Sequence, residues 1–199
     1  MTTTPELGVH RAVIGPLNGG NTHARVDLGF GVRVNTRLNL AVPGQPGIRH
    51  VRAWINEHGP DVAIRVTKPG PVRTSADLVD VDPPDLYRAA VVRVVDGDTL
   101  DTSLALGFGV RIDARLRLLG LNVAEKTTPD GVNVAAWVSS WVTAQDDQIV
   151  VETVKDRREK YGRMLAVVHG SRPGVPSLNE LLIGAGMAVP YDGGTRDRS

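Results

Sequence analysis

Hydrophobic and polar residues alternate along the stretch VRIDARLRLL, residues 110–119. One side carries Ile112, Ala114, Leu116 and Leu118, and the other carries Arg111, Asp113, Arg115 and Arg117. Successive side chains of a strand point to opposite faces, so this pattern predicts a half-buried strand. The β-branched run from Val91 to Val95, which is followed by Gly97, predicts another strand entering a turn. Several such strands, closed on themselves, form a small barrel.

Two later segments have helical periodicity. The positions i, i+3, i+4, i+7 and i+8 from residue 134 are apolar: Val134, Trp137, Val138, Trp141 and Val142. This spacing predicts an amphipathic helix whose apolar stripe packs on the barrel, with the tryptophans in the core. A second helix is expected over residues 177–186, because Ser177 and Glu180 form a capping-box pattern and Gly186 can end the helix.

The chain contains an internal repeat. LGFGVRVNTRLNLAV begins at Leu28 and LGFGVRIDARLRLLG begins at Leu106, with six consecutive identical residues at an offset of 78. We therefore expect a duplicated module. The predicted organisation is a degenerate repeat over residues 1–74, an acidic, proline-containing linker over 75–86, a second module over 87–194, and a polar tail over 195–199.

Composition narrows the class of protein. The 199 residues carry a net charge of +1 and contain no cysteine, which excludes a disulfide framework and thiolate metal sites. Positive and negative charges are balanced in both halves, so neither half has the overall basic charge typical of a nucleic-acid-binding domain. The start MTTTPELGVH lacks the features of a signal peptide, and no apolar run is long enough to cross a membrane. We expect a soluble protein, cytoplasmic or associated with a virion.

The second module contains the residue types that phosphodiester hydrolysis requires. Asp98 lies at the predicted turn, and Arg117 lies on the polar face of the alternating strand, with Asn122 and Glu125 after it. Arg163 follows a glycine further along the chain. Carboxylate and amide oxygens suit a hard cation, a carboxylate can deprotonate water, and arginines make paired hydrogen bonds to phosphate.

These residues lie in four motifs: VVRVVDGDTL, RLRLLGLNVAE, KYGRMLAVV and SLNELLIGAGMAV. In this order they resemble the staphylococcal-nuclease-like (thermonuclease) family, over residues 87–191. The resemblance implies an α+β, mainly β fold of tandem five-stranded OB-fold-like barrels with packed helices. It also implies a metal-dependent endonuclease that accepts DNA or RNA as its substrate.

The resemblance implies a calcium site, with Mg²⁺ or Mn²⁺ as alternative cations. Asp98, Asn122 and the backbone carbonyl of Val123 would bind the cation, and Asp96 would support them without binding it. The family pattern has an aspartate at the position of Asn122. The amide oxygen can still coordinate, but the site loses one negative charge, which weakens calcium binding.

The remaining roles concern water and phosphate. The resemblance assigns Glu125 to the attacking water and Arg117 and Arg163 to the scissile phosphate. Lys160 and Tyr161 would lie near the terminal phosphate of a bound nucleotide.

The first repeat lacks these groups. By the repeat offset, Gly20, Asn39 and Gly47 stand in place of the aspartate, arginine and glutamate. We expect a catalytically silent barrel that packs on the second, contacts nucleic acid or binds a protein.

Two other interpretations remain open. Asp96 and Asp98, taken alone, are typical of a polar turn. The whole chain could also be a non-catalytic structural or binding module, such as a virion component, with partners in self-association or virion assembly.

Overall fold

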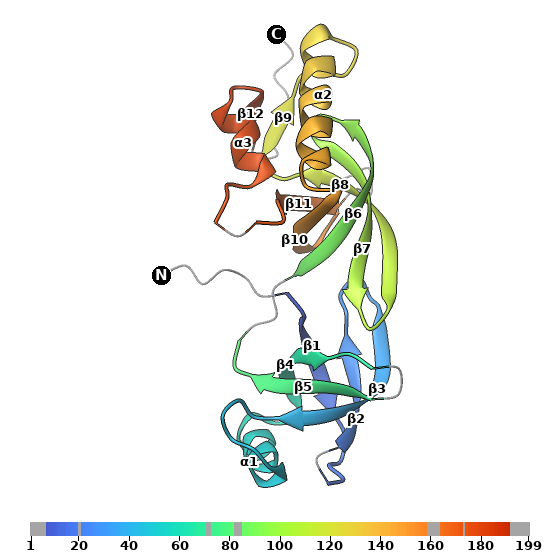
Figure 1. Ribbon diagram of the computed structural model, residues 1–199, viewed down its shortest axis with the longest axis vertical. Helices are drawn as coiled ribbons and strands as arrows, with labels where there is room; N and C mark the ends of the chain where they lie inside the picture. The colour runs from blue at the N-terminus through green and yellow to red at the C-terminus, as the bar shows by residue number, and fades with distance from the viewer. Residues whose placement is uncertain are drawn as a thin grey trace. The chain divides into compact units, whose positions relative to one another are not determined.

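The computed structural model describes residues 7–19, 21–70, 73–81, 85–158, 164–172 and 174–191. They divide into two compact units: the part before Asp85 together with Leu106–Val110, and Asp85–Ala105 together with the part from Arg111 onward. The fold is α+β and mainly β, and strands close into five-stranded barrels, as the sequence predicted (Figure 1).

The first unit is a closed barrel with one helix. Its elements are β1 (Val9–Ile14), β2 (Asn21–Asp27), β3 (Arg33–Ala41), α1 (Ile48–His58), β4 (Asp61–Lys68) and β5 (Thr74–Val79). The strand order around the barrel is β1-β2-β3-β5-β4, and β3 and β5 run parallel. Alternating apolar side chains fill the interior; Val26, Leu38, Ile64 and Leu78 are fully buried.

The predicted linker over residues 75–86 begins too early. Strand β5 occupies the first part of it, up to Val79, and pairs with both β3 and β4. Thr74, Ala76 and Leu78 point inward and are buried, whereas Ser75 and Asp77 point outward. The acidic residues of this stretch obscured the strand. Asp77 lies on the outer face of β5, and Asp80 follows its end.

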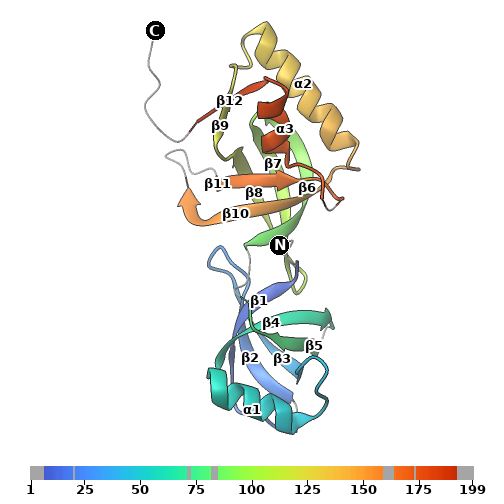
Figure 2. The same ribbon diagram turned by 90° about the vertical axis from the view of Figure 1, so that its left-hand side faces the viewer.

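The second unit is also a closed barrel, in the order β6-β7-β8-β11-β10 (Figure 2). Its barrel strands are β6 (Leu86–Asp96), β7 (Thr99–Gly107), β8 (Val110–Leu118), β10 (Gln148–Arg158) and β11 (Met164–His169). A separate two-stranded sheet consists of β9 (Leu121–Val123) and β12 (Ala188–Pro190). When the barrel strands of each unit are numbered from first to fifth along the chain, both barrels have the order first, second, third, fifth, fourth. The third and fifth strands run parallel in both barrels.

Both predicted helices of this unit are present. Helix α2 (Pro129–Thr143) begins at Thr128, whose side chain accepts a hydrogen bond from the Gly131 N–H. Its buried face is formed by Val134, Val138 and Val142, and its two tryptophans are half-buried. Helix α3 (Leu178–Gly184) begins with the predicted capping box of Ser177 and Glu180.

The LGFG segments form the same tight bend in both units. Phe30 and Phe108 have φ angles of 54° and 52°, in the left-handed region. The glycines on both sides of each phenylalanine also have positive φ. Glycine adopts this conformation without steric cost, which explains why the motif keeps two of them.

Candidate active site

The turn between β6 and β7 positions the candidate aspartate. The side chain of Asp96 accepts a hydrogen bond from the Gly97 N–H at 2.8 Å. A Cβ atom on Gly97 would lie 2.6 Å from Cγ1 of Val134, so helix α2 can pack on the turn only because residue 97 is glycine. The turn directs Asp98 inward, where it is 2% exposed.

Three groups donate hydrogen bonds to the Asp98 carboxylate. The Arg117 guanidinium forms an ion pair with it, and the Thr99 hydroxyl donates at 2.9 Å. The backbone N–H of Val123 is the third donor. The carbonyl of Asp98 accepts from the Leu118 N–H at 2.8 Å, which fastens the turn to the end of β8.

The charge of Asp98 depends on these donors. Burial raises the pKa of the Asp98 carboxyl above its ordinary value, and Arg117 and Thr99 act against this rise. The negative charge of Asp96 adds to the upward shift. A buried carboxylate with a shifted pKa and a cationic partner is typical both of functional sites and of structural ion-pair networks.

Arg117 connects the aspartate to the β9 segment. Its side chain is 17% exposed, and its guanidinium also donates to the side-chain oxygen of Asn122. The Asp98 and Asn122 oxygens therefore meet at one guanidinium. The structure brings together the side chains of Asp98, Arg117 and Asn122 and the backbone of Val123.

Glu125 lies in the loop between β9 and α2, and its side chain is exposed. Its carbonyl accepts hydrogen bonds from the backbone N–H of Thr128 at 2.9 Å and from the Thr128 hydroxyl at 2.8 Å. A Cβ atom on Gly131 would lie 2.1 Å from the same carbonyl oxygen. The first turn of α2 thus fixes the backbone of Glu125 two residues after Val123.

The predicted phosphate ligands Lys160, Tyr161 and Arg163 lie outside the described residues. The strand that follows them begins at Met164 and pairs in parallel with β8. In this register Leu165 lies opposite Arg117. The chain therefore enters β11 beside the strand that carries Arg117.

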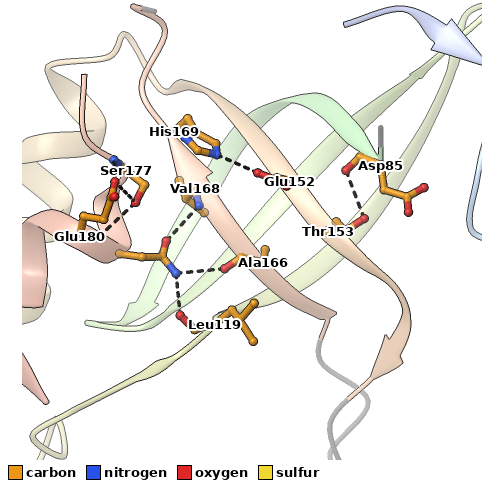
Figure 3. A network of polar contacts seen from close by, with 10 residues as sticks. Asp85, Leu119, Glu152, Thr153, Ala166, Val168, His169, Ser177 and Glu180 are labelled. Atoms are coloured by element: carbon orange, nitrogen blue, oxygen red, sulfur yellow. Dashed lines mark hydrogen bonds and ion pairs between the residues drawn. The ribbon is translucent and has the colours of Figure 1, made fainter. Parts of the chain in front are cut away.

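Sequence reasoning missed Asn179, which is 6% exposed in the first turn of α3. Its side-chain amide donates to the carbonyls of Leu119 and Ala166, at 2.9 and 3.2 Å, and its oxygen accepts from the Val168 N–H at 3.0 Å (Figure 3). Leu119 lies between Arg117 and Asn122, so Asn179 holds the segment that joins them. The only signal in the sequence is an amide on the apolar side of the predicted helix.

Within the described part of the chain, no three His, Asp or Glu side chains form a metal-binding group. The oxygens of Asp98 and Asn122 are of the type that Ca²⁺ and Mg²⁺ prefer. Asp98 supplies the single carboxylate of this pair, and both oxygens contact Arg117. The two side chains therefore offer a cation one carboxylate and one amide oxygen, and Arg117 contacts both of them.

An open pocket of about 840 Å³ adjoins the site. It lies between β9, α2 and the segment around β12, and Asn122, Asp130, Trp137 and Met187 are among its lining residues. Its walls are mainly apolar, in contrast to the charged contacts of Asp98.

Comparison of the sequence with protein-family models gives no match, and neither does a search of curated protein sequences. In the described residues, no helix is long and apolar enough to cross a membrane.

Proposed function

We propose that the chain is a metal-dependent nuclease, and that its second unit hydrolyses phosphodiester bonds of DNA or RNA. The observation that carries this proposal is the contact of one half-buried arginine, Arg117, with both Asp98 and Asn122. The order of the four motifs supports the same function, because it resembles that of staphylococcal-nuclease-like proteins.

In this proposal Asp98, Asn122 and the carbonyl of Val123 hold the cation, which is Ca²⁺, or Mg²⁺ or Mn²⁺. When bound, the cation supplies positive charge against the phosphoryl oxygens. Arg117 donates hydrogen bonds to the same phosphate from the wall of the site. Arg163 is assigned to the phosphate by its motif alone.

Glu125 accepts a proton from the attacking water. The water oxygen forms a bond to phosphorus, and the bond from phosphorus to the 5′-oxygen breaks. The 5′-oxygen leaves and is protonated from solvent. The exposed side chain of Glu125, on a backbone fixed by α2, supports this assignment, because the base must reach both water and substrate.

We further propose that both units are OB-like barrels that arose by duplication. The support is the shared strand order, the parallel third and fifth strands, and the phenylalanine in the left-handed conformation in each LGFG bend. The first unit is catalytically silent in this proposal, because Asn39 takes the place of Arg117.

Cleavage of a fluorophore-quenched single-stranded oligonucleotide tests the proposal. The purified chain is expected to cleave it with Ca²⁺, Mg²⁺ or Mn²⁺ and to stop when a chelator is added. Glu125→Gln should lower the rate about 100-fold or more, as loss of a general base does. A wild-type chain that stays inert with all three cations contradicts the proposal.

One observation favours a second candidate, a non-catalytic structural or nucleic-acid-binding module. The amide of Asn122 replaces the second carboxylate of the family pattern, and Arg117 already neutralises Asp98. Thermal unfolding with and without Ca²⁺ separates the two functions. An enzyme of this class gains stability on binding its cation, whereas a chain with no cation site does not.

A further inference from the structure

We propose that the first unit is a binding module for single-stranded nucleic acid, and that the outer face of β1, β2 and β3 contacts the phosphate backbone. This inference rests on the proposed function for its choice of ligand, which is the substrate class of the second unit. It assigns a role to the barrel that lacks the catalytic residues.

Strand alternation defines this face. The inward side chains of β2 and β3, among them Ala24, Val26, Leu38 and Leu40, are buried in the barrel. The outward ones are Arg11 and Val13 on β1, Asn21, His23, Arg25 and Asp27 on β2, and Arg33, Asn35, Arg37, Asn39 and Ala41 on β3. We call the nine polar and charged residues among them the basic face.

The register places the basic face on one continuous surface. Arg25 lies opposite Asn35, and His23 lies opposite Arg37. Nε of Arg37 donates to the ring nitrogen Nε2 of His23 at 3.3 Å, which directs the arginine across the two strands. Because the strands pair directly, donors on β2 and β3 can contact one extended ligand.

Positive charge is concentrated on this face, although the chain as a whole is nearly neutral. The basic face carries four arginines and one aspartate. That aspartate, Asp27, accepts a hydrogen bond from the Gly29 N–H at 2.9 Å and lies 3.6 Å from Arg33. Of the other described acids of the unit, Asp61 on β4 lies opposite Val13 at the edge of this face, and Glu57, Asp77 and Asp80 lie on α1, β5 and the turn that follows.

The spacing of the donors suits a phosphate backbone. Outward residues on β3 recur about every 6.8 Å, and arginine and asparagine alternate there. Both side chains donate hydrogen bonds to phosphate and sugar oxygens. The nine residues include no aromatic side chain for base stacking, so binding is expected to depend on the backbone and on salt rather than on sequence.

The corresponding face of the second unit is less basic. There Asp101 on β7 and Asp113 on β8 lie among the arginines of β6 and β8, and Arg93 and Arg115 both pair with Asp101. The second unit has Asp98 and Arg117 of the candidate active site, and the first unit lacks them. The outer face of the first unit has one aspartate among its arginines, whereas that of the second has two. Because both belong to one chain, substrate held by the first unit stays at a high local concentration for the second.

Fluorescence anisotropy of a labelled 20-nucleotide single strand tests this inference. The full chain is used with a chelator present, so that no cleavage occurs. The test variant is the triple change Arg25→Gln, Arg33→Gln and Arg37→Gln. The control variant removes the same charge elsewhere on the unit, through Arg49→Gln, Arg52→Gln and Lys68→Gln, which are all exposed.

At low salt the test variant is expected to bind at least about tenfold more weakly than wild type. The slope of log K against log salt concentration should also be smaller in magnitude by about 2, where K is the association constant. The control variant should bind within about twofold of wild type. Equal losses in both variants, or no loss in the test variant, would overturn the inference, as would tighter binding of a duplex of the same length. Thermal melts of all three proteins verify folding.

The outcome is separable from that of the nuclease proposal. Binding that depends on the basic face, in a chain that does not cleave with any cation, supports the inference and rejects the nuclease. Cleavage that is unaffected in the test variant at low substrate concentration rejects the inference and retains the nuclease.

Discussion

Arg117 and Asp98 form an ion pair between strand β8 and the β6–β7 turn, with side chains only 17% and 2% exposed. The same guanidinium holds the side-chain oxygen of Asn122. One arginine on β8 therefore connects the β6–β7 turn with the β9 segment. The contact opposes the rise in pKa that burial imposes on the Asp98 carboxyl, and it fixes the guanidinium near the end of β8.

Arg117→Met should destabilise the protein by about 2–4 kcal/mol, because it leaves the buried Asp98 carboxylate without its cationic partner. Urea denaturation of wild type and variant measures this loss. Arg111→Met removes an exposed arginine from the same strand face and serves as the control, with a change below about 1 kcal/mol. Equal effects of the two changes would contradict the importance of the ion pair.

Gly131→Ala should destabilise the protein by about 1–3 kcal/mol, because the new methyl group would collide with the Glu125 carbonyl. Gly184→Ala is the matched change, since it also lies in a helix but has open space around the added atom. It should be neutral or slightly stabilising. Thermal unfolding compares the two, and equal melting temperatures would show that the close approach at Gly131 is not required.

Asn179→Leu should cost about 2–4 kcal/mol, since the buried Val168 N–H and the carbonyls of Leu119 and Ala166 lose a partner. Hydrogen exchange provides a local readout. The amide of Val168 should exchange faster in the variant by a larger factor than amides of the first unit. Uniform changes in both units would contradict a local role.

Stability should fall at low pH through Asp101. Hydrogen bonds from Arg115 and Arg93 lower the pKa of Asp101 to about 2. Because the pKa is lower in the folded state, the stabilisation is fully present above the unfolded value of about 3.9 and is lost as pH falls toward 2. Carboxyl NMR titration measures the pKa directly. A value near 4 would show that the two arginines do not hold the carboxylate in solution.

Asn122→Asp should strengthen calcium binding about tenfold, because it adds a second carboxylate beside Asp98. Isothermal titration measures the affinity, and Asn133→Asp, at the adjoining pocket, is the control of equal charge. Equal gains in both variants would indicate a general effect of charge and not a site at Asn122.

Local patterns predicted much of this structure. The alternation in residues 110–119 predicted β8 with Arg117 on the polar side, and the capping pattern at Ser177 predicted the start of α3. These features are encoded by neighbouring residues, so a single sequence reveals them.

Features that depend on tertiary contacts were not predictable in the same way. Strand β5 lies in an acidic stretch, and its inward residues became recognisable only from pairing with β3 and β4. Asn179 bonds to residues 11 to 60 positions away, and nothing in its own neighbourhood indicates those partners. The close approach of α2 to Gly97 likewise depends on packing.

The most direct test of the nuclease proposal is the analysis of products from a 5′-labelled single-stranded oligonucleotide, with wild type and Glu125→Gln assayed in parallel. We expect calcium-dependent labelled fragments from wild type that end in a 3′-phosphate, because the bond to the 5′-oxygen breaks, and a rate at least about 100-fold lower for the variant. Equal rates for the two proteins, or no fragments from wild type with any of the three cations, would contradict it.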